Sequence, residues 1–264
     1  MTANRESTER TVADGTGAEP DRTDAAARLV DLWHRWENPG RSAQRGLNLR
    51  RIAEAAIEIA DADGLGAVSM ARVAERLGYT TMALYRHVSG KDELLAVMAE
   101  AAFEPALEDI PAGTPWRAGL ERWARAVLGR YLASPWLTDI NPTGLNSPVQ
   151  LKLMDQGLRL LAPTGLPYLE RLGVLLSLSA FIAGHARLVA YVARTEAGEG
   201  APMGTLMTHM AGSGQLPEAE AALAAGMLGD DDFDDFAFGL GLVLDGVERL
   251  LRRRGGATAD GDAP

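Results

Sequence analysis

The side chains best suited to chemistry lie close together, between residues 80 and 91. This stretch, TTMALYRHVSGK, combines threonine and serine hydroxyls with a phenol, an imidazole and two cationic groups. Such groups donate hydrogen bonds to phosphate oxygens and to the edges of DNA bases. The residue types therefore indicate nucleic-acid recognition, and the side chains placed to make the contacts are Thr80, Thr81, Met82, Tyr85, Arg86, His87 and Lys91.

Each group has its own part in that chemistry. The two threonine hydroxyls can bond phosphates or base edges, and the apolar side chain of Met82 suits a thymine methyl. Tyr85 and the two residues after it offer donors to phosphates. Lys91 begins a helix, so its ammonium and the free N–H groups of the first turn can hold one phosphate together. Two other interpretations stay open: Tyr85 could be a core aromatic, and His87 could be a pH switch.

Two short helices separated by a glycine would position these residues. Ser69 is placed to cap a helix with an inward apolar side, which ends at Gly78. A second helix would start at Thr80 or Thr81 and run to about His87. This is the helix-turn-helix arrangement, in which the leading residues of the second helix face the major groove of DNA.

Further helices flank this pair. The one before it ends at Gly64 and has a single apolar face of Leu49, Ile52, Ala56 and Ile59. The one after it should begin with a capping box of Ser89 and Asp92 and continue to the region of Pro105.

No β-alternation or internal repeat is present, so an all-α fold is expected. Residues 45–92 would form a three-helix helix-turn-helix domain, and residues 93–254 an effector-binding and dimerisation domain. Residues 1–44 would be an extension with an aromatic-faced helix over 24–37, disordered over 1–22, and residues 255–264 a disordered tail. Helices of the second domain are expected at 116–133, 148–161, 167–194 and 231–254, with a weakly helical connection over 201–226.

The composition is that of a globular intracellular protein. The chain has 264 residues, of which 47% are hydrophobic, and no cysteine, which excludes disulfides and thiolate chemistry. A polar opening argues against a signal peptide. The longest apolar stretch, 174–192, is interrupted by serine, histidine and arginine, so a partly buried helix is expected there rather than a membrane span. We expect a cytoplasmic location.

The charge distribution favours the same interpretation. The chain has a formal net charge of −10, yet residues 41–91 contain eight lysines and arginines against five carboxylates. DNA affinity depends on local neutralisation of phosphates rather than on the total charge. An acidic remainder would help to orient the approach to DNA.

At this point a family resemblance is specific. Residues 48–103, NLRRIAEAAIEIADADGLGAVSMARVAERLGYTTMALYRHVSGKDELLAVMAEAAF, closely resemble the DNA-binding domain of the TetR family of bacterial transcriptional repressors. The stretch FDDFAFGLGLVLDGVERLL, 233–251, resembles the last dimerising helix of the tetracycline-repressor-like branch. The middle of the chain resembles the family only in its helical layout.

The resemblance implies a homodimeric repressor that a small molecule releases from a palindromic double-stranded DNA operator. It places Thr80, Thr81, Met82, Tyr85, His87 and Lys91 on the DNA-contacting surface, with Ser69 and Arg72 in supporting contacts; Arg86 lies where members vary. Dimerisation would use the helices over 167–194 and 231–254. Apolar walls with few polar anchors suggest effector contacts at Met154, Leu158, Phe181 and His185, although the same residues describe a helical core equally well.

Other classes of site are less favoured by the sequence. The aspartates between 230 and 235 lack the ligand alternation of a calcium loop and fit the charging of a helix N-terminus better. The four histidines are too scattered for a metal signature, so neither a metal nor a cofactor is expected. An all-α enzyme with an incidental helix-turn-helix remains the less favoured alternative, because no nucleophile–base constellation is present. A ligand-independent regulator or activator is the other.

Overall fold

The fold described here is that of a computed structural model. It describes residues 22–39, 46–107, 109–140, 147–198, 201, 204–211, 215–226 and 233–257. Within those ranges every regular element is a helix, which confirms the all-α expectation. Residues 1–21 of the segment predicted to be disordered and most of the predicted C-terminal tail lie outside the described residues, while Arg22 already belongs to the first helix. The last helix runs past the predicted end at Arg254 to Ala257.

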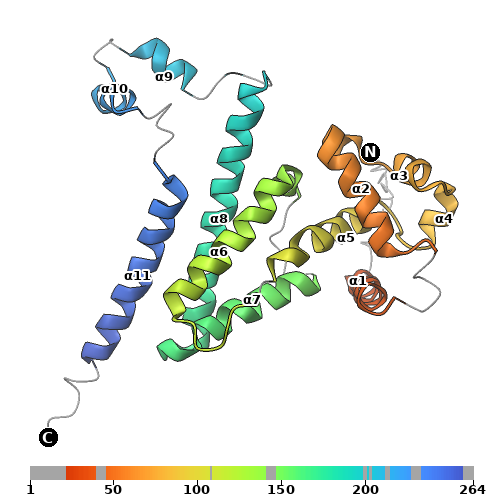
Figure 1. The fold of residues 1–264 in the computed structure, drawn as a ribbon, viewed down its shortest axis with the longest axis horizontal. Helices are drawn as coiled ribbons and strands as arrows, with labels where there is room; N and C mark the ends of the chain where they lie inside the picture. Colours follow the sequence, from red (N-terminus) through yellow and green to blue (C-terminus); the bar gives the residue numbers. More distant parts are fainter. Residues whose placement is uncertain are drawn as a thin grey trace, which may run out of the picture.

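The N-terminal half forms a compact head at one end of an elongated molecule (Figure 1). Its elements are α1 (Arg22–Glu37), α2 (Leu49–Asp63), α3 (Met70–Leu77) and α4 (Thr81–Tyr85), followed by α5 (Lys91–Phe103). Helix α5 packs along α2 and then continues out of the head, as Figure 1 shows. The head and the rest of the molecule are therefore joined by a helix.

The remaining helices form the second part of the molecule. Helices α6, α7 and α8 pack on one another, and α11 lies along α8 on the side away from the head (Figure 1). The bounds are α6 Trp116–Ala133, α7 Pro148–Leu160, α8 Tyr168–Glu196, α9 Thr205–Met210, α10 Pro217–Ala224 and α11 Asp235–Ala257. Single 3₁₀ turns cover Leu65–Ala67, Glu104–Ala106, Pro135–Thr138 and Ala162–Thr164.

Side-chain caps explain where the helices of the head begin and end. The carboxamide oxygen of Asn48 accepts the N–H of Arg51 at 2.9 Å at the start of α2. Ser69 accepts the N–H of Arg72 at 3.3 Å at the start of α3. Gly78 ends α3 in the left-handed region, with φ 73°, where a side chain would be strained. The predicted cap at Ser69, the stop at Gly78 and the start of the second helix at Thr81 are confirmed. The second helix ends at Tyr85, earlier than the predicted His87.

The predicted capping box of α5 is wrong. Its cap residue is Gly90, and neither Ser89 nor Asp92 caps it by a side chain. Instead the backbone N–H of Ser89 donates to a carboxylate oxygen of Glu93 at 2.7 Å, one residue later than the motif suggested. Only the reciprocal half of the box is formed.

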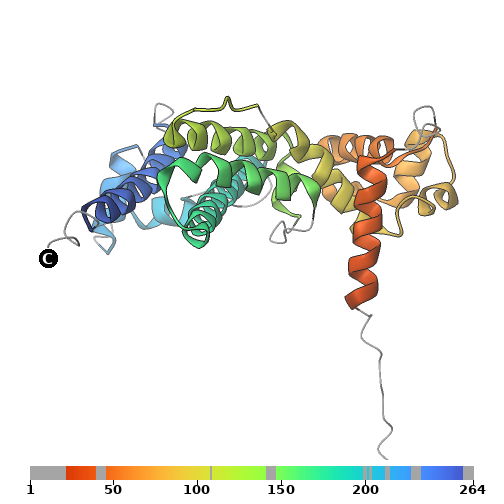
Figure 2. The same cartoon turned by 90° about the horizontal axis from the view of Figure 1, so that it is seen from below.

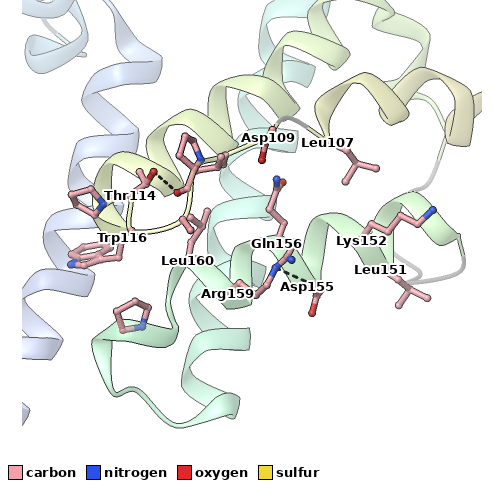
Figure 3. Close-up of a pocket in the computed structure, with 16 residues that line it drawn as sticks. Leu107, Asp109, Thr114, Trp116, Leu151, Lys152, Asp155, Gln156, Arg159 and Leu160 are labelled. Carbon is pink, nitrogen blue, oxygen red and sulfur yellow. Dashed lines mark hydrogen bonds and ion pairs between the residues drawn. The ribbon is translucent and has the colours of Figure 1, made fainter.

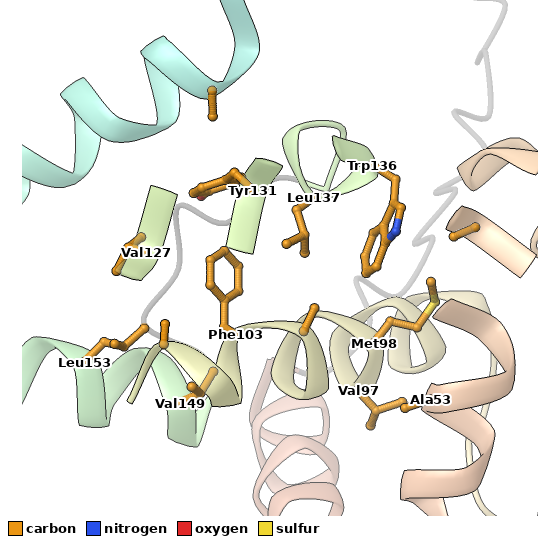
Figure 4. Close-up of a cluster of buried hydrophobic side chains, with 14 of the residues drawn as sticks. Ala53, Val97, Met98, Phe103, Val127, Tyr131, Trp136, Leu137, Val149 and Leu153 are labelled. Atoms are coloured by element: carbon orange, nitrogen blue, oxygen red, sulfur yellow. The ribbon is translucent and has the colours of Figure 1, made fainter. Parts of the chain in front are cut away.

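One continuous core joins the two parts of the molecule. Figure 4 shows Val97 beside Ala53 of α2 and, further along the cluster, Phe103 against Tyr131 of α6. The two rings meet edge to face, with centroids 5.1 Å apart. The indole N–H of Trp136 donates to the carboxylate of Asp61 at 2.6 Å and so ties the second part back to α2. The burial of α5 on both sides fixes the relative placement of the two parts.

Apolar side chains of α7 do not all face the core. Leu151, Met154, Leu158 and Leu161 have the spacing of one helix side, yet Leu151 is 46% exposed. The residues of α7 that are buried are Val149, Leu153 and Gly157. The pattern was ambiguous because leucines occupy more than one side of this helix, so periodicity alone could not select the buried one.

Helix α8 is packed against other helices of the chain along one side and is exposed along the other. It is the one helix among the described residues that is long and apolar enough to cross a membrane, and 22% of that stretch is buried. Its inner side packs on α6 and α7 through Leu175, Leu178 and Ile182. Its outer side leaves large apolar side chains exposed, as does the adjoining side of α11; these are Tyr168, Leu169, Leu176, Leu188, Phe238 and Leu242.

Candidate nucleic-acid interface and effector groove

The leading residues of α4 are presented to solvent on the outer end of the head. Met82 is 67% exposed and Tyr85 50% exposed, although both belong to types that usually pack inward. Leu84, between them, is fully buried and holds the helix to the head. Thr81 is exposed, while the hydroxyl of Thr80 accepts the N–H of Ala83 at 3.2 Å and caps the helix. The interpretation of Tyr85 as a core aromatic is therefore wrong.

The residues before α4 have structural partners of their own. Ser69 is occupied as the cap of α3. A guanidinium nitrogen of Arg72 lies 2.6 Å from a carboxylate oxygen of Asp63, and both side chains are about half exposed. Because such an exposed ion pair is weak, a phosphate could replace the carboxylate as the partner of Arg72. Arg72 lies on α3, the helix that packs against α4.

Lys91 and Arg86 are two further cations of the head. Lys91 is the first residue of α5 and is exposed, and no side chain caps the N–H groups of that first turn. Arg86 is exposed at the end of α4. Both cations follow the apolar and hydroxyl-bearing residues of α4 closely in the chain, a combination of groups that suits a DNA groove and its phosphates.

His87 is less open than the sequence suggested. Its ring is half-buried, and burial together with the nearby guanidinium of Arg35 lowers the pKa of His87 below its ordinary value. The imidazole is consequently neutral at pH 7 and can donate from one nitrogen only. The carbonyl of His87 accepts a hydrogen bond from Arg35 of α1 at 2.8 Å. Helix α1 therefore contacts the chain directly after α4.

Buried and paired charges gather where α1, α2, α5 and α7 meet. The carboxylate of Glu100 on α5 is 2% exposed, and its two oxygens accept the N–H of Val149 at 3.0 and 3.1 Å. It thereby caps α7, while burial raises the pKa of Glu100. Arg50 of α2 makes two hydrogen bonds to the carboxylate of Glu104, at 2.6 and 3.0 Å, which lower the pKa of Glu104.

A partly open groove of about 1270 Å³ lies on the second part of the molecule (Figure 3). One wall is the loop from Leu107 to Trp116, and the other is the outer side of α7. In Figure 3 the side chains labelled on α7 and the loop lie on either side of this space. Its lining mixes apolar groups with charged and amide groups: Trp116, Leu160, Lys152, Asp155, Gln156 and Arg159. It can hold a ligand with an apolar body and polar substituents.

None of the four residues proposed for effector binding lines this groove. Phe181 stacks on Phe236 of α11 with ring centroids 5.4 Å apart, and the His185 ring lies 5.1 Å from the same Phe236. Met154 and Leu158 are partly buried against the core. These four residues thus contact neighbouring helices in the structure, and their role in effector binding stays a prediction.

The residues of the groove could not be singled out from the sequence. Lys152, Asp155 and Arg159 have the spacing of an ordinary solvated helix face, and Arg159 pairs with Asp155 within α7 at 3.3 Å. They differ from the residues of such a face only because the fold places a loop opposite them. That loop contains Pro111, Gly113 and Pro115, a composition that predicts a turn but not its position.

Comparison with known proteins agrees with the geometry. Residues 52–98 match the family described as "Bacterial regulatory proteins, tetR family", and residues 96–251 match "Tetracyclin repressor-like, C-terminal domain". The chain is 37% identical over 248 residues to the HTH-type transcriptional repressor DrrR1 of Streptomyces coeruleorubidus, covering 89% of this chain and 90% of the relative.

Solved structures give the same answer. The transcriptional regulator SCO7222, a TetR from Streptomyces coelicolor, superposes with a TM-score of 0.63 at 25% identity, over 78% of this chain and 99% of that one. The TetR family protein ActR of Streptomyces coelicolor, in complex with actinorhodin, gives a TM-score of 0.65 at 25% identity, over 76% and 95%. The helix-turn-helix head, the helical second domain and these similarities together show that the chain belongs to the TetR family of DNA-binding transcriptional regulators.

Proposed function

We propose that the protein is a repressor that binds a palindromic DNA operator through the exposed side of α4. The observation that carries this is the exposure of Met82 and Tyr85 beside Thr81, with basic groups close by in the chain. The related DrrR1 is named a transcriptional repressor, which supports the direction of regulation. A repressor of this kind acts on chromosomal DNA, so we expect the protein to be located in the cytoplasm. The contacts would be made by Ser69, Arg72, Thr80, Thr81, Met82, Tyr85, Arg86, His87 and Lys91.

A homodimer would present two heads to successive major grooves, roughly 34–36 Å apart. The support is the uncovered apolar side of α8 and α11, where Leu169 is 83% and Leu242 60% exposed. Two copies of this helix pair can cover one another across a two-fold axis as a four-helix interface. The glycines of α11 would allow the close approach.

The groove between α7 and the loop 107–116 is our candidate effector site. The related ActR has been crystallised with actinorhodin, so a member with this fold accepts a small molecule. Since α5 is packed between α2 and α7, a ligand that prefers one position of α7 would tilt α5 and change the spacing of the two heads. A ligand-independent regulator would leave this groove without a role.

The DNA contacts can be tested on an operator that is itself selected in vitro. Rounds of selection from a random duplex pool would yield a bound sequence, and binding of that duplex is then measured between about 50 and 200 mM salt. We expect Lys91→Ala to weaken binding to all sequences and to reduce the salt slope by about one. Thr81→Ala should instead relax the base preference.

An exposed residue far from the head provides the control. Arg252→Ala removes a cation near the end of α11 and should change neither affinity nor salt slope. If no duplex is enriched, or if Lys91→Ala binds with the affinity and the salt slope of the natural chain, the proposed interface is wrong.

A further inference from the structure

Helix α1 lies outside both segments that match the family descriptions, the first of which begins at residue 52. Among the side chains of α1 that the structure describes, Leu32 and Trp36 in its C-terminal half are buried, whereas Val30 is 68% exposed. In Figure 2 this half lies against the head and the other end points away from it. The attached half is therefore the part whose contacts need an explanation.

Those contacts reach three different elements. Arg35 donates to the carbonyl of His87, directly after α4, at 2.8 Å. The ring of Trp36 lies under the guanidinium of Arg50 of α2, 4.6 Å from the ring centroid. Glu37 accepts a hydrogen bond from the ammonium of Lys152 on α7 at 2.8 Å. Consecutive residues of α1 thus touch the end of the recognition helix, the head and the second domain.

Lys152 has two roles at once. It is the partner of Glu37, and it also lines the groove between α7 and the loop 107–116 (Figure 3). Both members of the pair are about half exposed, so water already screens their attraction and a competing anion can replace the carboxylate. Of the cations that line the groove, Lys152 pairs with α1, while Arg159 pairs within its own helix.

We propose that α1 couples the effector groove to the recognition helix α4 as a rigid connecting helix, here called the strut. An anionic group of a bound ligand acts on the strut by pairing with Lys152 in place of Glu37. This rests on the proposed roles of the groove and of α4. It adds a further connection between the domains, beside α5 and the hydrogen bond from Trp136 to Asp61. Loss of the pair between Glu37 and Lys152 frees the last turn of α1 from α7. It thereby weakens the hydrogen bond from Arg35 to the carbonyl of His87.

The coupling makes a prediction that needs no identified ligand. In the full-length protein, Lys152→Gln removes the pair from the groove side, and Glu37→Gln removes it from α1. Each should increase amide hydrogen exchange over residues 80–88. In the proposal, Lys152 acts on these residues only through α1 and does not contact them. Each should also weaken binding of the selected duplex about two- to fivefold, the range of an exposed ion pair.

Two further variants sharpen the test. The double variant Glu37→Gln with Lys152→Gln should behave like either single variant, because one interaction has been removed in all three. Arg35→Met keeps the length of the side chain but cannot donate to His87, so it should reproduce the same exchange. Asp139→Asn removes an exposed ion pair to Arg194 within the second domain and should leave exchange over 80–88 unchanged.

The failures of the two proposals can be told apart. If the natural chain binds no selected duplex, the proposed DNA-binding function fails. If it binds, yet Lys152→Gln and Glu37→Gln show unchanged exchange over 80–88 and unchanged affinity, the strut alone is overturned. Additive effects of the two substitutions would equally overturn it, because they would show that the residues act separately.

Discussion

Glu100 has an unusual environment for a carboxylate, because its side chain is buried. Its carboxylate is buried on α5, and burial outweighs the hydrogen bonds from Val149 and Ser147, so the pKa of Glu100 is raised from its ordinary value of 4.5. A raised pKa means that the folded protein holds the proton more tightly than the unfolded chain. Between 4.5 and the raised pKa, Glu100 therefore lowers the free energy of unfolding as the pH increases.

We expect Glu100→Gln to remove this dependence, because the amide oxygen can still accept the N–H of Val149 without carrying a charge. Thermal unfolding of both proteins should be followed between about pH 4.5 and 7. The melting temperature of the natural protein relative to the variant should fall as the pH rises through this window. A difference that is constant with pH would show that burial does not govern the titration of Glu100.

For individual residues, the sequence predicted well which side chains of the head face outward, and it predicted poorly which ion pairs form between elements. Thr81, Met82, Tyr85 and Lys91 could be placed because local signals, a cap and a glycine stop, determine which way a short helix faces. The partners of Arg72 and Lys152 could not be predicted, because Asp63 and Glu37 meet them only through the tertiary fold. For the same reason the sequence did not single out the residues that line the groove.

At the scale of elements, the contact between α8 and α11 depends on a glycine. A Cβ built on Gly239 would lie 2.6 Å from a ring atom of Phe181, whose ring stacks on Phe236. Gly239 thus permits the close approach of α8 and α11 within one chain, whereas nothing lies within 4 Å of a Cβ on Gly241 or Gly246.

Gly239→Ala should therefore force Phe181 out of its stack and destabilise the protein by about 1–3 kcal/mol. Gly129→Ala is the matched control, since it is also a helical glycine but has open space around it. It should raise the free energy of unfolding by roughly 0.5–1 kcal/mol through helix propensity. Urea denaturation of the two variants compares them. Equal behaviour of both would mean that the α8–α11 packing is looser than described.

Helix bounds were largely predictable because periodicity and caps are local. The orientation of α7 was not, because apolar residues on more than one side compete for the core and the tertiary neighbours decide between them. The approach of the loop 107–116 to α7, which makes the groove, is likewise a property of the assembled fold.

For the whole molecule, the uncovered apolar side of α8 and α11 leads to a prediction about assembly. Leu242→Glu places a charge in the centre of that side and should convert a dimer to a monomer in sedimentation at micromolar concentration. Affinity for the selected duplex should fall by more than about tenfold, because two linked heads bind far better than one.

Leu132→Glu provides the comparison for this prediction. Leu132 is a leucine of similar exposure, 47%, but it lies on α6, outside the proposed interface. This variant should remain dimeric and bind DNA normally. If both variants stay dimeric, the interface lies elsewhere on the molecule.

Helix α5 begins in the head at Lys91 and ends in the second domain at Phe103, with no loop between the two. The direction in which the recognition helix faces therefore depends on the rotation about the axis of α5 between its two ends. One residue inserted into α5 would turn the head by about 100° around the helix axis. Chimaeras that exchange heads between such regulators must therefore keep the residue count of this helix, or two well-folded halves will face different ways.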